Sequence, residues 1–216
     1  MMTTRPNSES DNGCLREMGE DVYQLHALDP APSTIVDIGA NIGAFSILAA
    51  TMFPAATIRA FEPERDNYTL LCRNVAAYGF QDRIEILRAA VTDDREGVSL
   101  YPCEGLSHAC VTPGEHCLAL HGHGAERVWC DSVTLADALD GLGPVDLLKV
   151  DCEGSEFEIF AGQTDTLDNV RALRMEIHDY RTPADLEWLW SKLSATFTMR
   201  VAAFVPGRGG YWFGDR

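Results

Sequence analysis

One stretch decides the fold of this chain: Thr34-Ile-Val-Asp-Ile-Gly-Ala-Asn-Ile-Gly-Ala-Phe-Ser46. Its first residues are mostly β-branched and lie between Pro32 and Gly39, which is typical of a short strand buried on both faces of a parallel sheet. From Ala44 to Phe53 the residues are helix formers or bulky apolar side chains. The stretch therefore predicts a strand, a turn and a helix, the first half of a βαβ unit.

The turn itself has the composition of a ligand-binding loop. Gly39 and Gly43 lack Cβ, which permits unusual dihedrals and close approach of a ligand, and amides at a helix start can donate to a carboxylate. The dinucleotide fingerprint is incomplete, because Asn41 occupies the middle glycine position and Gly43 comes one residue before the third. Asp37 would repel phosphates but suit an ammonium group. The turn thus favours an amino-acid-like cofactor such as S-adenosylmethionine.

A second acid follows the next strand. Thr57–Phe61 reads as a short strand that leads to Glu62 and Pro63, and Glu62 comes 19 residues after Gly43. In βαβ nucleotide sites a carboxylate about 20 residues after the glycine turn accepts hydrogen bonds from the ribose hydroxyls. We therefore expect Glu62 to bind a ribose. The alternative is a solvated acid at a helix N-terminus, stabilised by the helix dipole.

The overall composition limits the partners. The chain has 216 residues, 46% of them hydrophobic, and a formal net charge of −16. Such a charge repels nucleic-acid phosphates and anionic membranes, so we expect neither as a partner. Seven cysteines with no export signal argue for reduced thiols, and the start of the chain has no apolar signal core. These features predict a cytoplasmic protein.

The predicted organisation is a single domain from residue 14 to 216 after a disordered N-terminus, residues 1–13. Residues 14–30 contain apolar positions three and four apart from Leu15 to Leu28, which predicts a helix that packs on the sheet edge or covers a substrate. Residues 93–130 predict an inserted loop rich in cysteine and histidine. Cys-x-x-Cys pairs are absent from that loop, so the sequence favours an active-site loop over a zinc site. Its candidate ligands are Cys103, His108, Cys110, His116, Cys117, His121, His123 and Cys130.

Ionisable residues gather at the ends of two later strands. Val145–Val150 and Leu173–His178 read as buried strands, and a C-terminal antiparallel hairpin follows them. The carboxyl edge of a parallel sheet is where open α/β folds bind ligands. The charged residues expected at that edge are Lys149, Asp151, Glu153, Glu176 and His178.

Six motifs in order resemble the FkbM family of S-adenosylmethionine-dependent methyltransferases. They are Val36-Asp-Ile-Gly-Ala-Asn-Ile-Gly43, Phe61-Glu-Pro63, Leu71-Cys-Arg-Asn74, Ala89-Ala90-Val91, Leu148-Lys-Val-Asp-Cys-Glu-Gly-Ser-Glu156 and Met175-Glu-Ile-His178. The resemblance implies a Rossmann-like class I methyltransferase fold: a doubly wound, mostly parallel α/β sheet of seven strands with an antiparallel C-terminal hairpin. It also implies methylation of hydroxyls on sugars or secondary metabolites.

The resemblance assigns roles to residues of this chain. Asp37, Gly39, Asn41 and Gly43 would hold the methionine part of the cofactor, Glu62 with Pro63 the ribose, and the Ala90 region the adenine, with Asp151 also near the cofactor. Cys152 and the inserted loop depart from the family pattern.

Catalysis would require removal of a proton from the acceptor. His178 is the first candidate base, since its ordinary pKa lies near physiological pH, and Asp151 is the second. A core histidine satisfied by the backbone is the alternative for His178. Asp151, Glu176 and His178 could also share a divalent ion, although a metal is not expected.

Other functions stay open from the sequence. They are N-methylation of a small molecule or amino acid, a nicotinamide oxidoreductase, and a noncatalytic cofactor- or zinc-binding module. The expected partner is a small-molecule substrate, and a homodimer is left open.

Overall fold

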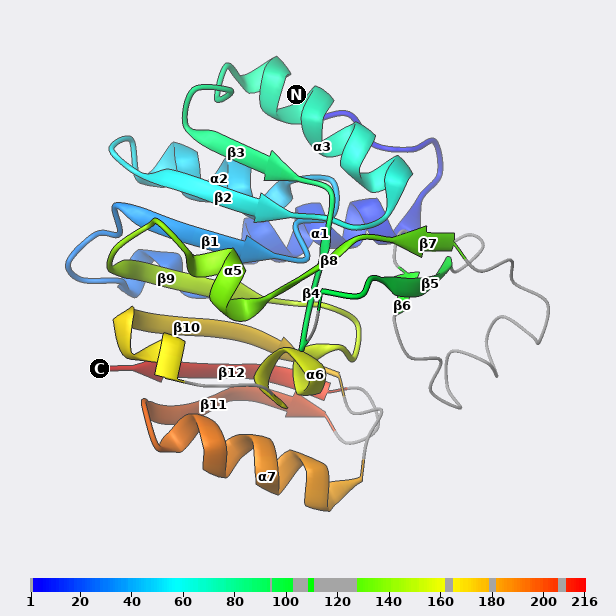
Figure 1. Cartoon of the computed structure of the whole chain (residues 1–216). Helices are drawn as coiled ribbons and strands as arrows, with labels where there is room; N and C mark the ends of the chain where they lie inside the picture. Colours follow the sequence, from blue (N-terminus) through cyan, green and yellow to red (C-terminus); the bar gives the residue numbers. More distant parts are fainter. Residues whose placement is uncertain are drawn as a thin grey trace.

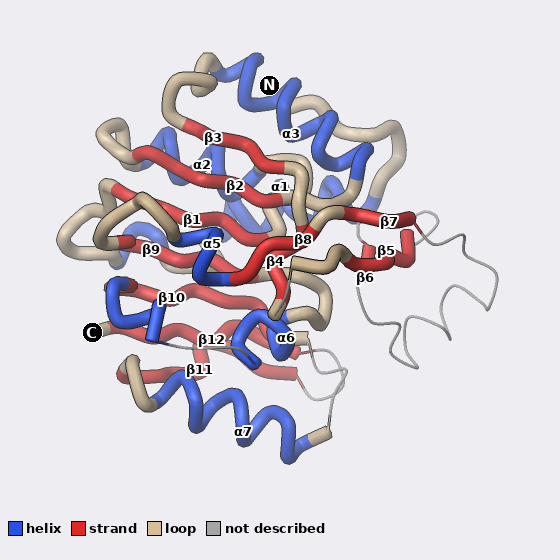
Figure 2. The backbone as a smooth tube through the Cα atoms, viewed as in Figure 1, coloured by secondary structure: helices blue, strands red, loops and turns tan. Residues whose placement is uncertain are grey.

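A seven-stranded sheet forms the centre of the protein, with helices on both faces (Figures 1 and 2). The computed structural model describes residues 2–93, 95–102, 109–110, 128–161, 165–178, 182–205 and 209–216. In spatial order the strands are β11 (Thr198–Val205), β12 (Gly209–Asp215), β10 (Val170–Ile177), β9 (Val145–Val150), β1 (Thr34–Ile38), β2 (Thr57–Phe61) and β3 (Ile84–Leu87).

The direction of the strands confirms the predicted fold class. Strands β3, β2, β1, β9 and β10 pair in parallel, whereas β12 is antiparallel to both β10 and β11. The chain runs outward from β1 to β3 and then returns to β9 on the other side of β1. The strand order therefore reverses between β1 and β9, and in open α/β sheets ligands bind in the crevice at such a point.

Two apolar clusters lie on opposite faces of the sheet. One joins the sheet to α2 (Ala44–Met52) and α3 (Arg65–Tyr78), with α1 (Glu9–Glu20) packed on α2. The other joins it to α5 (Leu135–Leu139), α6 (Glu156–Ala161) and α7 (Pro183–Ser194). Short 3-10 helices span Leu25–Ala27 and Asp165–Asn169. Among the described helices, none has the length and apolar character needed to cross a membrane.

Local sequence explains where several helices begin and end. The Glu64 carboxylate accepts hydrogen bonds from the backbone N–H groups of Asp66 and Asn67, which caps the start of α3. Gly79 ends α3 with a φ of 74°, a left-handed conformation that glycine adopts without strain. Thr182 caps α7 reciprocally with Asp185.

Two small sheets lie beyond the carboxyl edge of the main sheet (Figure 1). β4 (Ala90–Thr92) pairs in parallel with β8 (Ser132–Thr134). β5 (Val98–Pro102) pairs with β6 (Ala109–Cys110) and with β7 (Val128–Cys130). Most cysteines and histidines of the predicted loop 93–130 lie outside the described residues, so its zinc alternative stays a prediction.

The structure describes residues 2–13, which the sequence predicts to be disordered, and gives them a helix start and specific contacts. The backbone N–H of Thr3 donates to the Asn74 side chain at 2.6 Å. Arg5 forms an ion pair at 2.6 Å with Asp11, which is fully buried. Ser8 caps α1 by accepting a hydrogen bond from the Asp11 N–H. Hydrogen bonds and an ion pair hold this segment in place. Such contacts produce no periodic apolar pattern, so the sequence did not indicate them.

The helix predicted over residues 14–30 has different bounds. α1 begins at Glu9 and ends at Glu20. Asp21 and Gln24 both have positive φ angles, 48° and 52°, which interrupt a right-handed helix before the 3-10 turn. The apolar spacing therefore indicates which side chains face the protein, but it does not indicate that the helix ends at Glu20.

Candidate active site

A cavity of about 230 Å³ opens at the carboxyl edge of the sheet, across β2, β1, β9 and β10. Its position is the crevice where the strand order reverses. Helix α1 also lines the cavity through Cys14, Glu17 and Met18, so this helix covers the site as well as packing on α2. The strand ends contribute Gly39, Ala40, Asn41, Glu62, Pro63, Ala90, Lys149, Asp151, Glu153, Glu176 and His178.

The turn after β1 is held between its two neighbouring strands. The N–H groups of Gly39 and Ala40 both donate to the carbonyl of Phe61, at 3.0 and 2.9 Å. A Cβ on Gly39 would lie 1.8 Å from the backbone oxygen of Asp151, and the φ of Gly39 is +79°. Glycine is therefore required here by the close approach of the strand ends, in addition to the access that it gives to the cavity.

The two remaining turn residues differ in their exposure to the cavity. Asn41 lines it, with a φ of 51°, and its backbone N–H donates to Glu62 Oε2 at 2.8 Å. Gly43 lies outside the described cavity lining, and a Cβ there would sit 2.6 Å from Leu71 Cδ1. Gly43 therefore packs closely against α3, and its predicted contact with the cofactor stays a prediction.

Glu62 is a buried acceptor at the β2 side of the cavity. Its side chain receives hydrogen bonds from the N–H of Asn41, from the N–H of Glu64 at 2.9 Å and from Asn67 Nδ2 at 3.4 Å. Burial nevertheless raises the pKa of Glu62 to about 7, because these donors only partly offset the loss of water. Further donors, such as a pair of hydroxyl groups, would stabilise the carboxylate.

Small apolar residues form the wall beside Glu62. Ala89, Ala90 and Val91 are buried and line the cavity with Pro63 and Leu100. Their short side chains leave space for a flat ring, as the sequence predicts for the Ala90 region. Because these side chains carry no polar atoms, ring recognition here would depend on shape and apolar contact.

Asp37 lies beneath the cavity, not in its wall. The residue is fully buried, its Oδ2 accepts a hydrogen bond from Ser46 Oγ at 2.6 Å, and its Oδ1 lies 3.2 Å from Lys149 Nζ. Burial lowers the pKa of Lys149, but the carboxylates of Asp37 and Asp151 outweigh that effect and raise it. Lys149 Nζ also donates to the Gly39 carbonyl at 2.7 Å. Asp37 thus already pairs with an ammonium group of the chain, that of Lys149, and its predicted contact with the ammonium group of a ligand stays a prediction.

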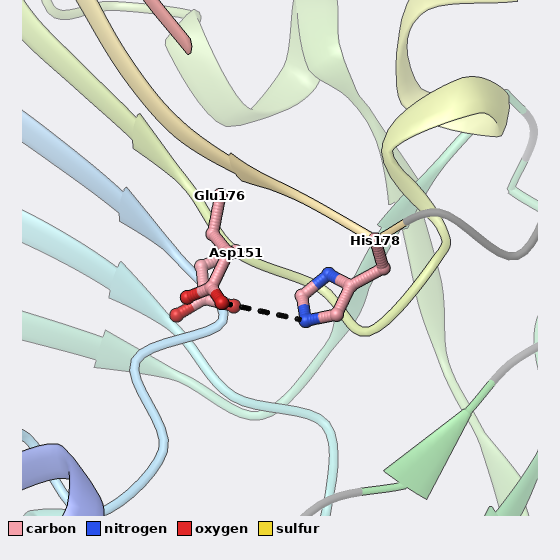
Figure 3. Close-up of side chains that lie close together, drawn as sticks. All are labelled: Asp151, Glu176 and His178. Carbon is pink, nitrogen blue, oxygen red and sulfur yellow. Dashed lines mark ion pairs between the residues drawn. The ribbon is translucent and has the colours of Figure 1, made fainter. Parts of the chain in front are cut away.

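Three predicted residues converge at the β9 and β10 side. Figure 3 shows the carboxylates of Asp151 and Glu176 side by side, with the imidazole of His178 facing them. Ligand-type atoms of the three residues all lie within 4.8 Å of one another. Tyr23, which no sequence motif indicated, donates its hydroxyl hydrogen to Asp151 Oδ2 at 3.0 Å.

A buried carboxylate orients the imidazole of His178. Nδ1 lies 2.9 Å from Glu156 Oε1, which also accepts from the N–H groups of Cys152 and Gly154. Since a carboxylate accepts and an N–H donates, Nδ1 carries a hydrogen. Nε2 then faces Glu153 Oε2 at 3.4 Å and Glu176 Oε1 at 4.0 Å.

Burial and the short distances between the acids shift the pKa values of this cluster. Burial, followed by the charge of Asp151, raises the pKa of Glu176 to about 8. Burial opposes the charged form of His178, but Glu153 and Glu156 raise its pKa well above the ordinary value. Burial also opposes ionisation of Asp151, whereas Lys149 and His178 favour it and lower its pKa. The cluster can therefore bind a proton, a cation or a hydroxyl donor.

A family model described as the methyltransferase FkbM domain matches residues 37–197. The chain belongs to the FkbM methyltransferase family. The match begins at Asp37 of the turn and continues past His178, so it includes each strand end that lines the cavity.

Three named methyltransferases are similar to this chain in sequence. 31-O-demethyl-FK506 methyltransferase FkbM of Streptomyces tacrolimicus is 27% identical over 73% of this chain and 70% of its own length. Hexuronic acid methyltransferase AglP of Haloferax volcanii is 30% identical over 88% of this chain and 76% of its own length. Methyltransferase sdnD of Sordaria araneosa is 29% identical over 66% of this chain and 66% of its own length. The chain thus spans about two thirds to three quarters of these relatives.

A solved structure gives the same picture of the fold. The precorrin-6y C5,15-methyltransferase from Geobacter metallireducens GS-15 superposes with a TM-score of 0.55 at 13% identity, covering 100% of this chain and 93% of that chain. At this identity the likeness concerns the fold alone. It confirms the Rossmann-like methyltransferase class for this FkbM-family chain.

Proposed function

We propose that this FkbM-family chain transfers a methyl group from S-adenosylmethionine to a hydroxyl of a small molecule. One observation carries the proposal: a single cavity joins Glu62 to the group formed by Asp151, Glu176 and His178. Three strand spacings separate β2 from β10, which corresponds to roughly 14 Å. A nucleoside at the Glu62 side can therefore extend its amino-acid arm along the turn toward an acceptor at the other side.

The described residues fit the cofactor at its nucleoside end. Glu62 is buried and under-compensated by its N–H donors, so ribose hydroxyls would stabilise its ionised form. Ala90 and Val91 provide a flat apolar wall for adenine. Gly39 and Asn41 line the cavity between this wall and Asp151, where the methionine part would lie.

Alignment and deprotonation of the acceptor would fall to residues at the ends of β9 and β10. Bound S-adenosylmethionine supplies a methyl carbon already activated for displacement. The chain must align the acceptor oxygen and remove its proton. Asp151, fixed by Tyr23 and Lys149, and His178, fixed by Glu156, are the groups that we assign to this end.

Names of the relatives support an oxygen acceptor. The Streptomyces tacrolimicus protein is named for a 31-O position and the Haloferax volcanii protein for a hexuronic acid. A sugar or secondary-metabolite hydroxyl is therefore the acceptor class that we propose for this chain. Transfer to nitrogen is the competing outcome.

Calorimetry with S-adenosylhomocysteine tests the cofactor part of the proposal. Glu62→Ala is expected to weaken binding by about 1–3 kcal/mol, because it removes a charged hydrogen-bonding partner. Glu85→Ala is the matched control, since that carboxylate is 57% exposed on β3 and lies outside the described cavity lining. Equal affinities for the two variants would remove Glu62 from the ribose site, and binding of NADH in place of S-adenosylhomocysteine would overturn the cofactor assignment.

Transfer of a radiolabelled methyl group tests the acceptor part. The chain is incubated with separate pools of hydroxyl and amine acceptors, and label is expected in the hydroxyl pool. Label in the amine pool alone would replace O-methylation with N-methylation.

A further inference from the structure

The strand register brings two carboxylates and an imidazole to one place. β9 and β10 are parallel neighbours in which Val150 pairs with Met175, so Asp151 and Glu176 are next in register. Glu176 and His178 are two residues apart, and alternate residues of a strand share a face. All three side chains therefore project into the same part of the cavity, as Figure 3 shows, with their ligand-type atoms within 4.8 Å of one another.

The imidazole of His178 is hydrogen-bonded to a buried carboxylate, as the imidazoles of metal-binding histidines usually are. Glu156 is fully buried and engages Nδ1 of His178 at 2.9 Å, while the N–H groups of Cys152 and Gly154 hold the same carboxylate oxygen. A ligating histidine almost always donates its second ring N–H to such a partner, which fixes the ring and the tautomer. The nitrogen presented to the two carboxylates is then Nε2.

Carboxylates outnumber cations among the described residues at this end of the cavity. Glu17, Asp151, Glu153 and Glu176 gather here, whereas Lys149 is shared between Asp37 at 3.2 Å and Asp151 at 3.4 Å, and His178 Nε2 lies 3.4 Å from Glu153. Buried like charges are costly unless a cation joins them. Tyr23 and Lys149 both engage Oδ2 of Asp151, which leaves Oδ1 as its ligand atom.

We propose that Asp151, Glu176 and His178 bind one divalent cation of the magnesium and manganese class. The two carboxylates suit Mg²⁺ and Mn²⁺, and the imidazole favours a first-row transition ion such as Mn²⁺ of the two. The sequence prediction was that a divalent metal is possible but not expected. The role of the ion rests on the proposed function: it would fix the acceptor hydroxyl beside the cofactor and make that hydroxyl more acidic.

Binding of Mn²⁺ tests the site directly and needs no methyl acceptor. The full chain is stripped with a chelator and titrated with Mn²⁺, and electron paramagnetic resonance measures the unbound ion. One bound equivalent is expected. Asp151→Asn and Glu176→Gln should lose that equivalent, and Glu156→Gln should weaken the affinity by about 10- to 100-fold, as expected for a residue behind a ligand.

Glu17→Gln provides the matched control. It removes one carboxylate from the same cavity without touching the three ligands, so the bound equivalent should persist. Thermal unfolding and S-adenosylhomocysteine calorimetry on each variant show that loss of Mn²⁺ is not loss of folding.

Two results would overturn the metal site: no bound equivalent in the unchanged chain, or equal losses in Glu17→Gln and Glu176→Gln. Failure of the metal site and failure of the proposed function are distinguishable. Methyl transfer that persists after exhaustive chelation rejects the metal and keeps the methyltransferase proposal. A bound equivalent without any affinity for S-adenosylhomocysteine rejects the proposed function and keeps the metal site.

Discussion

Replacement of Glu62 by glutamine should change how stability depends on pH. The folded protein holds the proton of this buried carboxyl more tightly than the unfolded chain, since its pKa rises from 4.5 to about 7. Stability from this group is therefore present at low pH and is lost as pH rises through the folded pKa. Glu62→Gln cannot ionise, so the variant should escape that loss.

The size of the effect follows from the shift. One pKa unit corresponds to about 1.4 kcal/mol, so the full shift is worth roughly 3 kcal/mol, of which about 2 kcal/mol falls between about pH 5.5 and about pH 8.5. Glutamine also disturbs the hydrogen bonds from Asn41 and Glu64, but that cost is nearly independent of pH. The difference in unfolding free energy between Glu62→Gln and wild type is therefore compared at the two pH values. The change in this difference with pH reports the ionisation of Glu62 alone.

Urea unfolding of the ligand-free protein at the two pH values measures this difference. Relative to wild type, Glu62→Gln should gain about 2 kcal/mol on going from the lower to the higher pH. Glu85→Gln, at a side chain that is 57% exposed, controls for the loss of one negative charge. If the free-energy difference between Glu62→Gln and wild type is the same at both pH values, the carboxyl is not held in a high-pKa state and the reasoning fails.

Two further predictions concern the turn. Lys149→Met should lower the free energy of unfolding by about 3–5 kcal/mol in urea titrations, because it leaves the charge of Asp37 buried without its partner; an unchanged value would show that this pair does not stabilise the fold. Gly39→Ala should cost at least about 1–3 kcal/mol and weaken S-adenosylhomocysteine binding, since its φ is +79° and its Cβ would lie 1.8 Å from the Asp151 oxygen. Gly19→Ala, which has open space on α1, should do neither, and matching results from the two glycine variants would contradict the packing argument.

The sheet was predictable because each central strand carries its own signal. Ile35, Val36 and Leu148 are fully buried, and their segments are rich in apolar residues, as is typical of strands covered on both faces. The ends of two strands were also predictable, since Glu62 directly follows β2 and Asp151 directly follows β9. The predicted edge positions of Glu62 and His178 followed directly.

The N-terminal segment shows why contacts between polar residues far apart in the sequence were not predictable. Asp11 is completely buried although it is an acid, because Arg5 meets it through two side-chain hydrogen bonds. Arg5 also donates to Asn67, whose own side chain reaches Glu62. Such a network joins residues far apart in sequence, and hydrophobic periodicity contains no record of it.

Two buried acids near the turn differ in the partners that the chain supplies to their carboxylates. This difference helps to distinguish a structural carboxylate from one that faces a ligand. Asp37 and Glu62 lie near the ends of the neighbouring strands β1 and β2, and the sequence assigns both to the cofactor. The chain supplies Asp37 with a cation and a hydroxyl, Lys149 at 3.2 Å and Ser46 at 2.6 Å. It supplies Glu62 with N–H dipoles only, at the wall of a cavity. Because these donors only partly offset the burial of Glu62, a further donor admitted by the cavity would stabilise its carboxylate, as the proposed ribose contact requires.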